Sequence, residues 1–91
     1  MRLDELHFLK GEKRYVQFEI MSRKQQKVVV VDAEYEISHC DEIIASGKCE
    51  IVDDCILQIL TEQLDVGSYN LEITYTIAPE IGKVRCKIHV S

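Results

Sequence analysis

Apolar and polar residues alternate along most of this chain, and a period of two is typical of β-strands with one buried face. In two early segments the apolar positions that share a face are Val16, Phe18 and Ile20, followed by Val29, Val31, Ala33, Tyr35 and Ile37. The longest regular alternation covers residues 67–77, and the last strand places Val84, Cys86, Ile88 and Val90 on one face. These faces predict a core built from strands.

Short polar or glycine-containing segments separate the strands. Turns are expected at 38–41, at Ser46–Gly47, at Asp53–Asp54 and around 78–82. With an opening strand near 3–9, this gives seven or eight short strands about 8–12 residues apart, which predicts an antiparallel sandwich of two sheets. A chain of 91 residues is too short for several cores, so a single domain over 1–91 is expected.

One corner of the sequence resembles the immunoglobulin-like sandwiches. These folds carry the pattern Asp-x-Gly-x-Tyr-x-Cys before their penultimate strand, and Asp65, Gly67, Tyr69 and Leu71 match it with leucine in the cysteine position. We expect the Tyr69 hydroxyl to bond backbone a few residues upstream, as in the tyrosine corner of that superfamily. Gly67 would permit the tight chain reversal that precedes it. The prediction is an all-β, immunoglobulin-like antiparallel β-sandwich of seven to eight strands with Greek-key topology.

The usual core disulfide and tryptophan of that superfamily are absent. Phe18 is expected in place of the upstream cysteine, and Tyr35 fills the space of the missing tryptophan. The sandwich is therefore expected to be held by packing alone.

Composition and charge narrow the function classes. The longest apolar run, KVVVVDA, is much shorter than the roughly 20 residues of a membrane helix, and no secretory signal opens the chain. The cytoplasm is therefore the expected site of synthesis, with no membrane association. A net charge of -5 disfavours nucleic-acid binding through phosphate contacts.

The four cysteines, Cys40, Cys49, Cys55 and Cys86, include no C-x-x-C pair, so neither zinc nor any other cofactor is expected. Cys49 and Cys86 are predicted to be small core residues, and all four are expected to be free thiols. A Cys49–Cys55 or Cys40–Cys49 bridge is the alternative, and it would require an oxidising compartment.

No set of residues predicts catalysis. His7, His39 and His89 are far apart in the sequence, and no motif joins one of them to a nucleophile. The paired carboxylates of Asp53–Asp54 are explained by a turn. We therefore expect a protein that is not an enzyme.

The last strand carries outward basic residues, Lys83, Arg85 and Lys87, followed by His89. In an immunoglobulin-like sheet the strand with Glu72 lies beside it, and the strand with Glu34 and Glu36 lies one further across. Cross-strand ion pairs, or protection of an edge strand by charge, would explain the basic residues structurally. The functional alternative is docking to the acidic stretch Asp32, Glu34 and Glu36 of a partner protein or of another copy.

Taken together, the segments GEKRYVQFEI, VVVVDAEYEI, LTEQLDVGSYNLEITY and GKVRCKIHV resemble small immunoglobulin-like domains of tailed bacteriophages and prophages, over about residues 10–91. In that group the domain occurs in tail, baseplate or neck proteins as an adaptor or decoration. The resemblance implies a non-enzymatic structural module that could be incorporated into a virion. The alternative is a small cytosolic binding or regulatory module that captures a protein segment at an exposed sheet edge.

Overall fold

The computed structural model describes residues 3–21, 28–61, 64–77 and 79–91, and throughout these ranges the regular structure is β. Eight strands are present: β1 (Leu3–Phe8), β2 (Arg14–Glu19), β3 (Asp32–His39), β4 (Glu42–Lys48), β5 (Glu50–Val52), β6 (Ile56–Thr61), β7 (Gly67–Ile77) and β8 (Glu80–Val90). The all-β prediction and the expected number of strands are confirmed.

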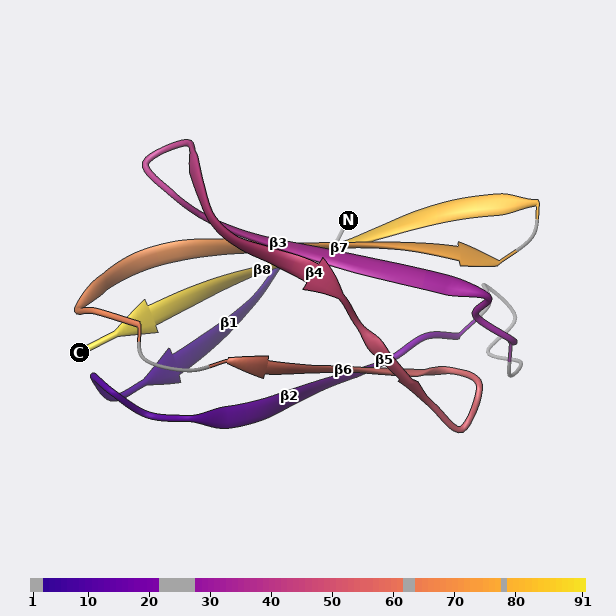
Figure 1. Cartoon of the computed structure of the whole chain (residues 1–91), viewed down its shortest axis with the longest axis horizontal. Coiled ribbons are helices and arrows are strands. Elements are labelled where there is room, and N and C mark those ends of the chain that lie inside the picture. The colour runs from indigo at the N-terminus through magenta and orange to yellow at the C-terminus, as the bar shows by residue number, and fades with distance from the viewer. Residues whose placement is uncertain (1–2, 22–27, 62–63, 78) are drawn as a thin grey trace.

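The strands form two sheets that face each other across the core (Figure 1). One has five strands in the order β1-β8-β7-β3-β4, and the other has three in the order β2-β6-β5. Neighbouring strands are antiparallel, except that β1 runs parallel to β8. The expectation of a fully antiparallel sandwich was wrong at this pair, because the first and last strands pair with each other across the whole length of the sequence.

The strand order also corrects the expected position of the last strand. β8 lies between β1 and β7, so its basic residues do not protect an edge. The edges of the larger sheet are β1 and β4. All seven residues of β4 are exposed or partly exposed, including Ile43 and Ile44 at 56% and 48%.

The core lies between the two sheets and is almost entirely apolar. Its most deeply buried side chains come from β6, β7 and β8: Leu57, Ile59, Leu71, Ile73, Cys86 and Ile88. The predicted inward faces of the segment 16–20 and of β8 are confirmed: Val16 in β2 and Ile20 just after it are buried, and Phe18 is partly buried against the core. Tyr35 is partly buried and packs against this core.

The valine run before β3 departs from the predicted alternation. Val29 and Val31 are 58% and 59% exposed, whereas Val30 is buried at 4%. The reason is that the chain changes sheets here. The Val30 amide donates to the Asp54 carbonyl beside the smaller sheet, and the Val31 amide donates to the Thr76 carbonyl of β7. The alternation restarts in a new phase at Ala33.

Two glycines assigned to turns lie inside strands instead. Gly47 belongs to β4 opposite Tyr35, and Gly82 belongs to β8 opposite Tyr75. A Cβ atom at Gly47 would lie 3.2 Å from the Tyr35 ring, and one at Gly82 would lie 2.4 Å from the Tyr75 ring. The glycines therefore make room for tyrosine rings from neighbouring strands. No turn occurs at 46–47, and β8 already begins at residue 80.

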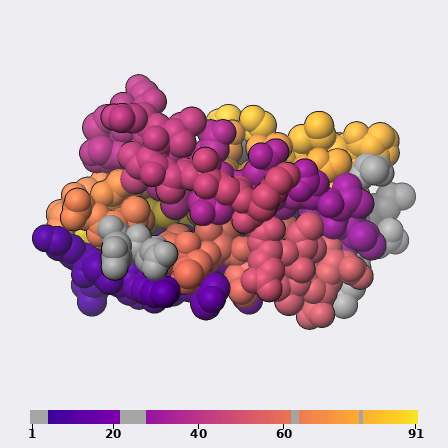
Figure 2. Space-filling model, in the orientation of Figure 1, coloured from indigo at the N-terminus to yellow at the C-terminus, as the bar shows by residue number. Residues whose placement is uncertain are grey.

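The other predicted turns are confirmed. β3 and β4 are joined through Cys40 and Asp41, and the segment between β5 and β6 passes through Asp53 and Asp54. All four residues have positive φ angles, between 50° and 68°, which left-handed turns require and which aspartate tolerates better than cysteine does. The β3–β4 hairpin projects from the body of the molecule (Figure 2).

Candidate functional site

The outer face of the five-stranded sheet carries the charged residues that the sequence analysis selected. Basic side chains on β8 form one row, named here the basic stripe: Lys83, Arg85 and Lys87. Acidic side chains on β3 form a second row, the acidic stripe: Asp32, Glu34 and Glu36. β7 runs between the two stripes and pairs with both strands. The stripes are thus brought onto one face, at equal distances on either side of β7.

Glu72, at the middle of β7, neutralises part of the basic stripe. Its carboxylate accepts from Lys83 Nζ at 3.2 Å through one oxygen and from Arg85 Nε at 3.0 Å through the other. The bond from Lys83 is the main cause that lowers the pKa of Glu72; burial opposes it, and the bond from Arg85 lowers the pKa further. The predicted cross-strand ion pairs are therefore confirmed. These side chains are 34–55% exposed, so each pair is worth only about 0.2–1 kcal/mol.

Asp32, at one end of the acidic stripe, is also paired within its own sheet. Lys48 on β4 donates to both carboxylate oxygens, at 3.0 and 3.1 Å. This contact lowers the pKa of Asp32 and raises that of Lys48. Asp32 is therefore less available to a partner than Glu34 and Glu36 are.

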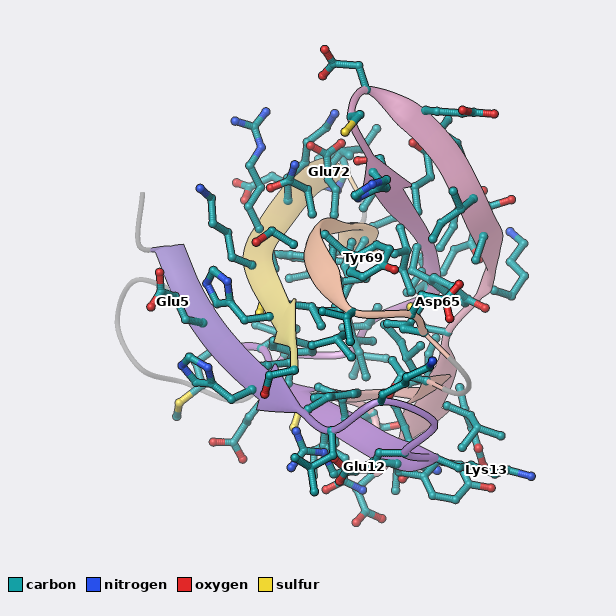
Figure 3. The ribbon with its side chains drawn as sticks, turned by 90° about the vertical axis from the view of Figure 1, so that its left-hand side faces the viewer. Glu5, Glu12, Lys13, Asp65, Tyr69 and Glu72 are labelled. Carbon is teal, nitrogen blue, oxygen red and sulfur yellow. The ribbon has the colours of Figure 1, made fainter. Side chains whose placement is uncertain are left out.

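The remaining charges of the two stripes have no ion-pair partner among the residues that the structure describes. They are Glu34, Glu36 and Lys87, all exposed. A hollow of about 500 Å³ lies on this face between β3 and β8, and Glu36, Glu72, Arg85 and Lys87 are among its lining residues. Figure 3 shows Glu72 on the outside of the sheet. The face is therefore open, hollowed and charged, with opposite signs on its two sides.

His7 and His89, which are far apart in the sequence, meet beside Ser68 at one end of the same face, whereas His39 packs against the Tyr69 ring. His89 Nδ1 lies 3.3 Å from the Ser68 hydroxyl, and its Nε2 lies 3.6 Å from the Glu5 carboxylate. His7 stacks on the His89 ring, and His39 Nδ1 lies 2.9 Å from the Ser68 carbonyl oxygen. The outward alternation of β1, β7 and β8 could have placed these side chains on one face, but only the pairing of β1 with β8 brings them together.

This serine, histidine and glutamate have the residue types of a nucleophile, a base and an orienting acid. However, the contacts of 3.3 and 3.6 Å are longer than the roughly 2.6–3.2 Å typical of such a relay. The Ser68 side chain is exposed and does not line the hollow between β3 and β8.

The tyrosine corner lies inside the sandwich, away from the outer face. The Tyr69 hydroxyl donates to the Asp65 carbonyl oxygen at 2.8 Å, and the residue is buried at 6%. Gly67 has a φ of +151°, in a region that favours glycine, and Leu71 is buried at 1%. Figure 3 shows Tyr69 turned inward next to Asp65. The hydrogen bond expected from the sequence pattern is present, and its role is structural.

The four cysteines form no disulfide with one another, and only Cys40 is exposed. Burial, reinforced by the charges of Asp32 and Glu34, raises the pKa of the Cys49 thiol to about 11, so it is protonated at neutral pH. Over the described ranges, no group of three or more histidine, cysteine or acidic residues is arranged to hold a metal ion. In the same part of the chain, no helix is long and apolar enough to cross a membrane.

Comparisons with known proteins support only the fold. No protein-family model matches the sequence, and no curated protein matches it. Among solved structures, the chain is similar to the crystal structure of an engineered protein from the Northeast Structural Genomics Consortium, with a TM-score of 0.77 at 10% sequence identity. The match covers 97% of this chain and 18% of that one. Such a likeness extends to the fold and carries no activity with it.

Proposed function

We propose that this chain is a non-enzymatic module that acts through protein–protein contacts made by the outer face of its five-stranded sheet. The observation that carries the proposal is the placement of acidic and basic stripes on opposite sides of β7, around an open hollow. Opposed charges of this kind fix the orientation of a partner and speed its approach more than they raise affinity.

The fold that we propose for this module is an immunoglobulin-like sandwich with Greek-key topology. Two observations support it. The strand order places β2, β6 and β5 in one sheet and β8, β7 and β3 in the other, which matches the division of such domains into B-E-D and G-F-C strands. The Tyr69 hydroxyl also bonds the backbone upstream of the penultimate strand.

We propose further that the module is a structural or adaptor component of a bacteriophage or prophage particle. The support is the sequence resemblance to phage domains over about residues 10–91. In this role, the chain is made in the cytoplasm and incorporated into the virion by contacts of the outer face.

The test is incorporation into particles induced and purified from the native host. The outer-face variant Glu36→Lys/Lys87→Glu exchanges two unpaired charges without changing the net charge. The matched control, Glu19→Lys/Lys10→Glu, makes the same exchange at exposed positions in and before β2. We expect wild type and control in the particles and the outer-face variant largely excluded. Equal incorporation of all three would argue against this face, and absence of the wild-type chain would argue against a virion role.

One further observation favours the alternative of a small cytosolic binding or regulatory module. β4 is an exposed edge strand with Ile43 and Ile44 accessible, and an unpaired edge of this kind can add a strand from a partner. The extra residue at Ile44, where the pairing with β3 shifts register, interrupts that edge. A proline at Ser46 would abolish strand addition and leave binding by the outer face intact, which separates the two candidates.

A further inference from the structure

The strand registers determine how the charged residues are arranged on the outer face, and this arrangement indicates a partner for it. We propose that this face binds a second copy of the same chain, with the two sheets packed face to face about a two-fold axis that runs along β7. The inference rests on the proposed function, because it assumes that the outer face is a contact surface. Beyond the proposed function, it identifies the partner as a second copy of the chain and names the residues of the two copies that face each other.

Two rows of paired residues run across the sheet. In one row Thr74 of β7 lies between Glu34 of β3 and Lys83 of β8, and in the next Glu72 lies between Glu36 and Arg85. Neighbouring strands are about 4.8 Å apart, so each acidic residue is as far from β7 on one side as its basic counterpart is on the other.

A two-fold rotation about β7 exchanges the two sides. It therefore places Lys83 opposite Glu34 of the second copy and Arg85 opposite Glu36 of the second copy. Because the axis is two-fold, each contact occurs twice, as it must in a self-complementary interface. Asp32 falls opposite Ile81, and Lys48 of its own sheet already neutralises that carboxylate. The arrangement thus leaves no acidic side chain of β3 facing another acidic one.

Glu72 is the only charged residue of β7 on the axis, where it meets its own symmetry mate. This meeting is tolerable because Lys83 and Arg85 neutralise each Glu72 within its own sheet. An axis along β8 would instead set the basic stripe against itself, and an axis along β3 would do the same to the acidic stripe. Like-charge contacts in those alternatives select the axis along β7.

The contact is small and polar. Sheets packed face to face cross at about 30°, so β7 is inclined by about 15° to the two-fold axis and residues one row from the centre, about 7 Å along the strand, are displaced by about 3.5 Å. Lysine and arginine side chains are long enough to follow such a displacement. Three strands over this length bury on the order of 1,000 Å² in total, which is the size of a weak, transient interface. Its affinity is expected to depend strongly on salt.

A charge-exchange experiment tests the geometry. One variant, Lys83→Glu/Arg85→Glu, makes both stripes acidic, and the other, Glu34→Lys/Glu36→Lys, makes both basic. Both variants are made in a Glu72→Gln background, because Lys83 and Arg85 neutralise Glu72 in the wild type and the acidic variant loses both. We expect each variant alone to be monomeric and an equimolar mixture of the two to form a heterodimer, because every facing pair of stripe residues in the mixture has opposite charges. The variant with all four substitutions in the same background restores opposite signs and is expected to dimerise again.

Sedimentation velocity provides the measurement. For wild type we expect the association constant to fall at least tenfold between about 50 mM and about 500 mM NaCl, since exposed charges are screened over about 8 Å at physiological salt. Thermal unfolding followed by circular dichroism checks that each variant is folded. Lys10→Glu/Lys13→Glu in the same Glu72→Gln background changes the net charge as much as the acidic variant does, but in the segment between β1 and β2, and is expected to keep the dimer.

Two results would overturn the inference: a wild type that stays monomeric at low salt, or folded variants whose mixture does not associate. The first result, combined with exclusion of the outer-face variant from particles, would mean that the face binds a different protein, and the proposed function would survive. Conversely, a dimer with the predicted charge exchange but no incorporation into particles would leave the inference standing and remove the virion role.

Discussion

Replacing Tyr69 by phenylalanine removes one hydrogen bond and leaves the packing of the ring in place. The hydroxyl donates to the Asp65 carbonyl at 2.8 Å from a residue that is only 6% exposed. Loss of a buried hydrogen bond usually costs about 1–3 kcal/mol, depending on whether the partner can be solvated. Asp65 is exposed, so water can reach its carbonyl group in the variant. We therefore expect a loss of about 1–2 kcal/mol, and a melting temperature about 5–15 °C lower for a chain of this size.

Tyr75→Phe is the matched control, because Tyr75 lies on the same strand and is partly buried. Within the described part of the chain its hydroxyl has no hydrogen-bond partner, so the expected loss is below about 0.5 kcal/mol. Urea unfolding followed by circular dichroism measures the free energy of unfolding of both variants. The dependence of that free energy on urea concentration should be the same as in wild type. Equal losses in the two variants would refute the reasoning that the Tyr69 hydroxyl stabilises the corner.

The strand pairings and the pKa values can be tested by stability, by thiol reactivity and by pH dependence. Gly82→Ala should lower the free energy of unfolding by about 1–2 kcal/mol in a denaturant titration, because the new methyl group would overlap the Tyr75 ring. If that overlap is the cause, the same substitution should cost less in a Tyr75→Ala background. Under native conditions an alkylating reagent should modify Cys40 rapidly and Cys49 very slowly, as followed by mass spectrometry, since Cys40 alone is exposed and the pKa of Cys49 is about 11; fast modification of several thiols would contradict this. The lowered pKa of Glu72 means that its contribution to stability is present above the ordinary pKa of 4.5 and is lost as the pH falls through the lower folded value. Glu72→Gln should therefore be less stable than wild type near neutral pH and should approach it in acid, and a difference independent of pH would refute the assignment.

The sequence predicted those parts of the fold that depend on alternation within one strand. Val16 in β2, Ile20 directly after it, and Cys86 and Ile88 in β8 point into the core as their spacing requires. The basic stripe was found in the same way. The pairing of these basic residues with Glu72 could also be predicted from the sequence, because neighbouring antiparallel strands place their outward side chains next to each other.

The predictions failed where structure depends on contacts between distant segments. Val30 is buried because the chain changes sheets there, which no local alternation reveals. Gly47 and Gly82 were read as turn residues, whereas each accommodates a ring from the neighbouring strand. The cluster of histidines depends on the parallel pairing of His7 with His89, at opposite ends of the sequence.

The parallel pairing of β1 with β8 also determines how the protein would respond to mechanical force. If the chain is pulled at residues 1 and 91, β1 is drawn towards its beginning and β8 towards its end, so the two strands slide past each other in opposite directions. The register from Leu3–Arg85 to Phe8–Val90, extended by hydrogen bonds between Phe8, Lys10 and Ser91, is then loaded all at once. A hairpin pulled at its open end breaks one bond after another, whereas this pair must lose its bonds together. Under tension, separating β1 from β8 would therefore be the step that needs the greatest force. Because it is also the first step, the outer face stays intact until β1 detaches.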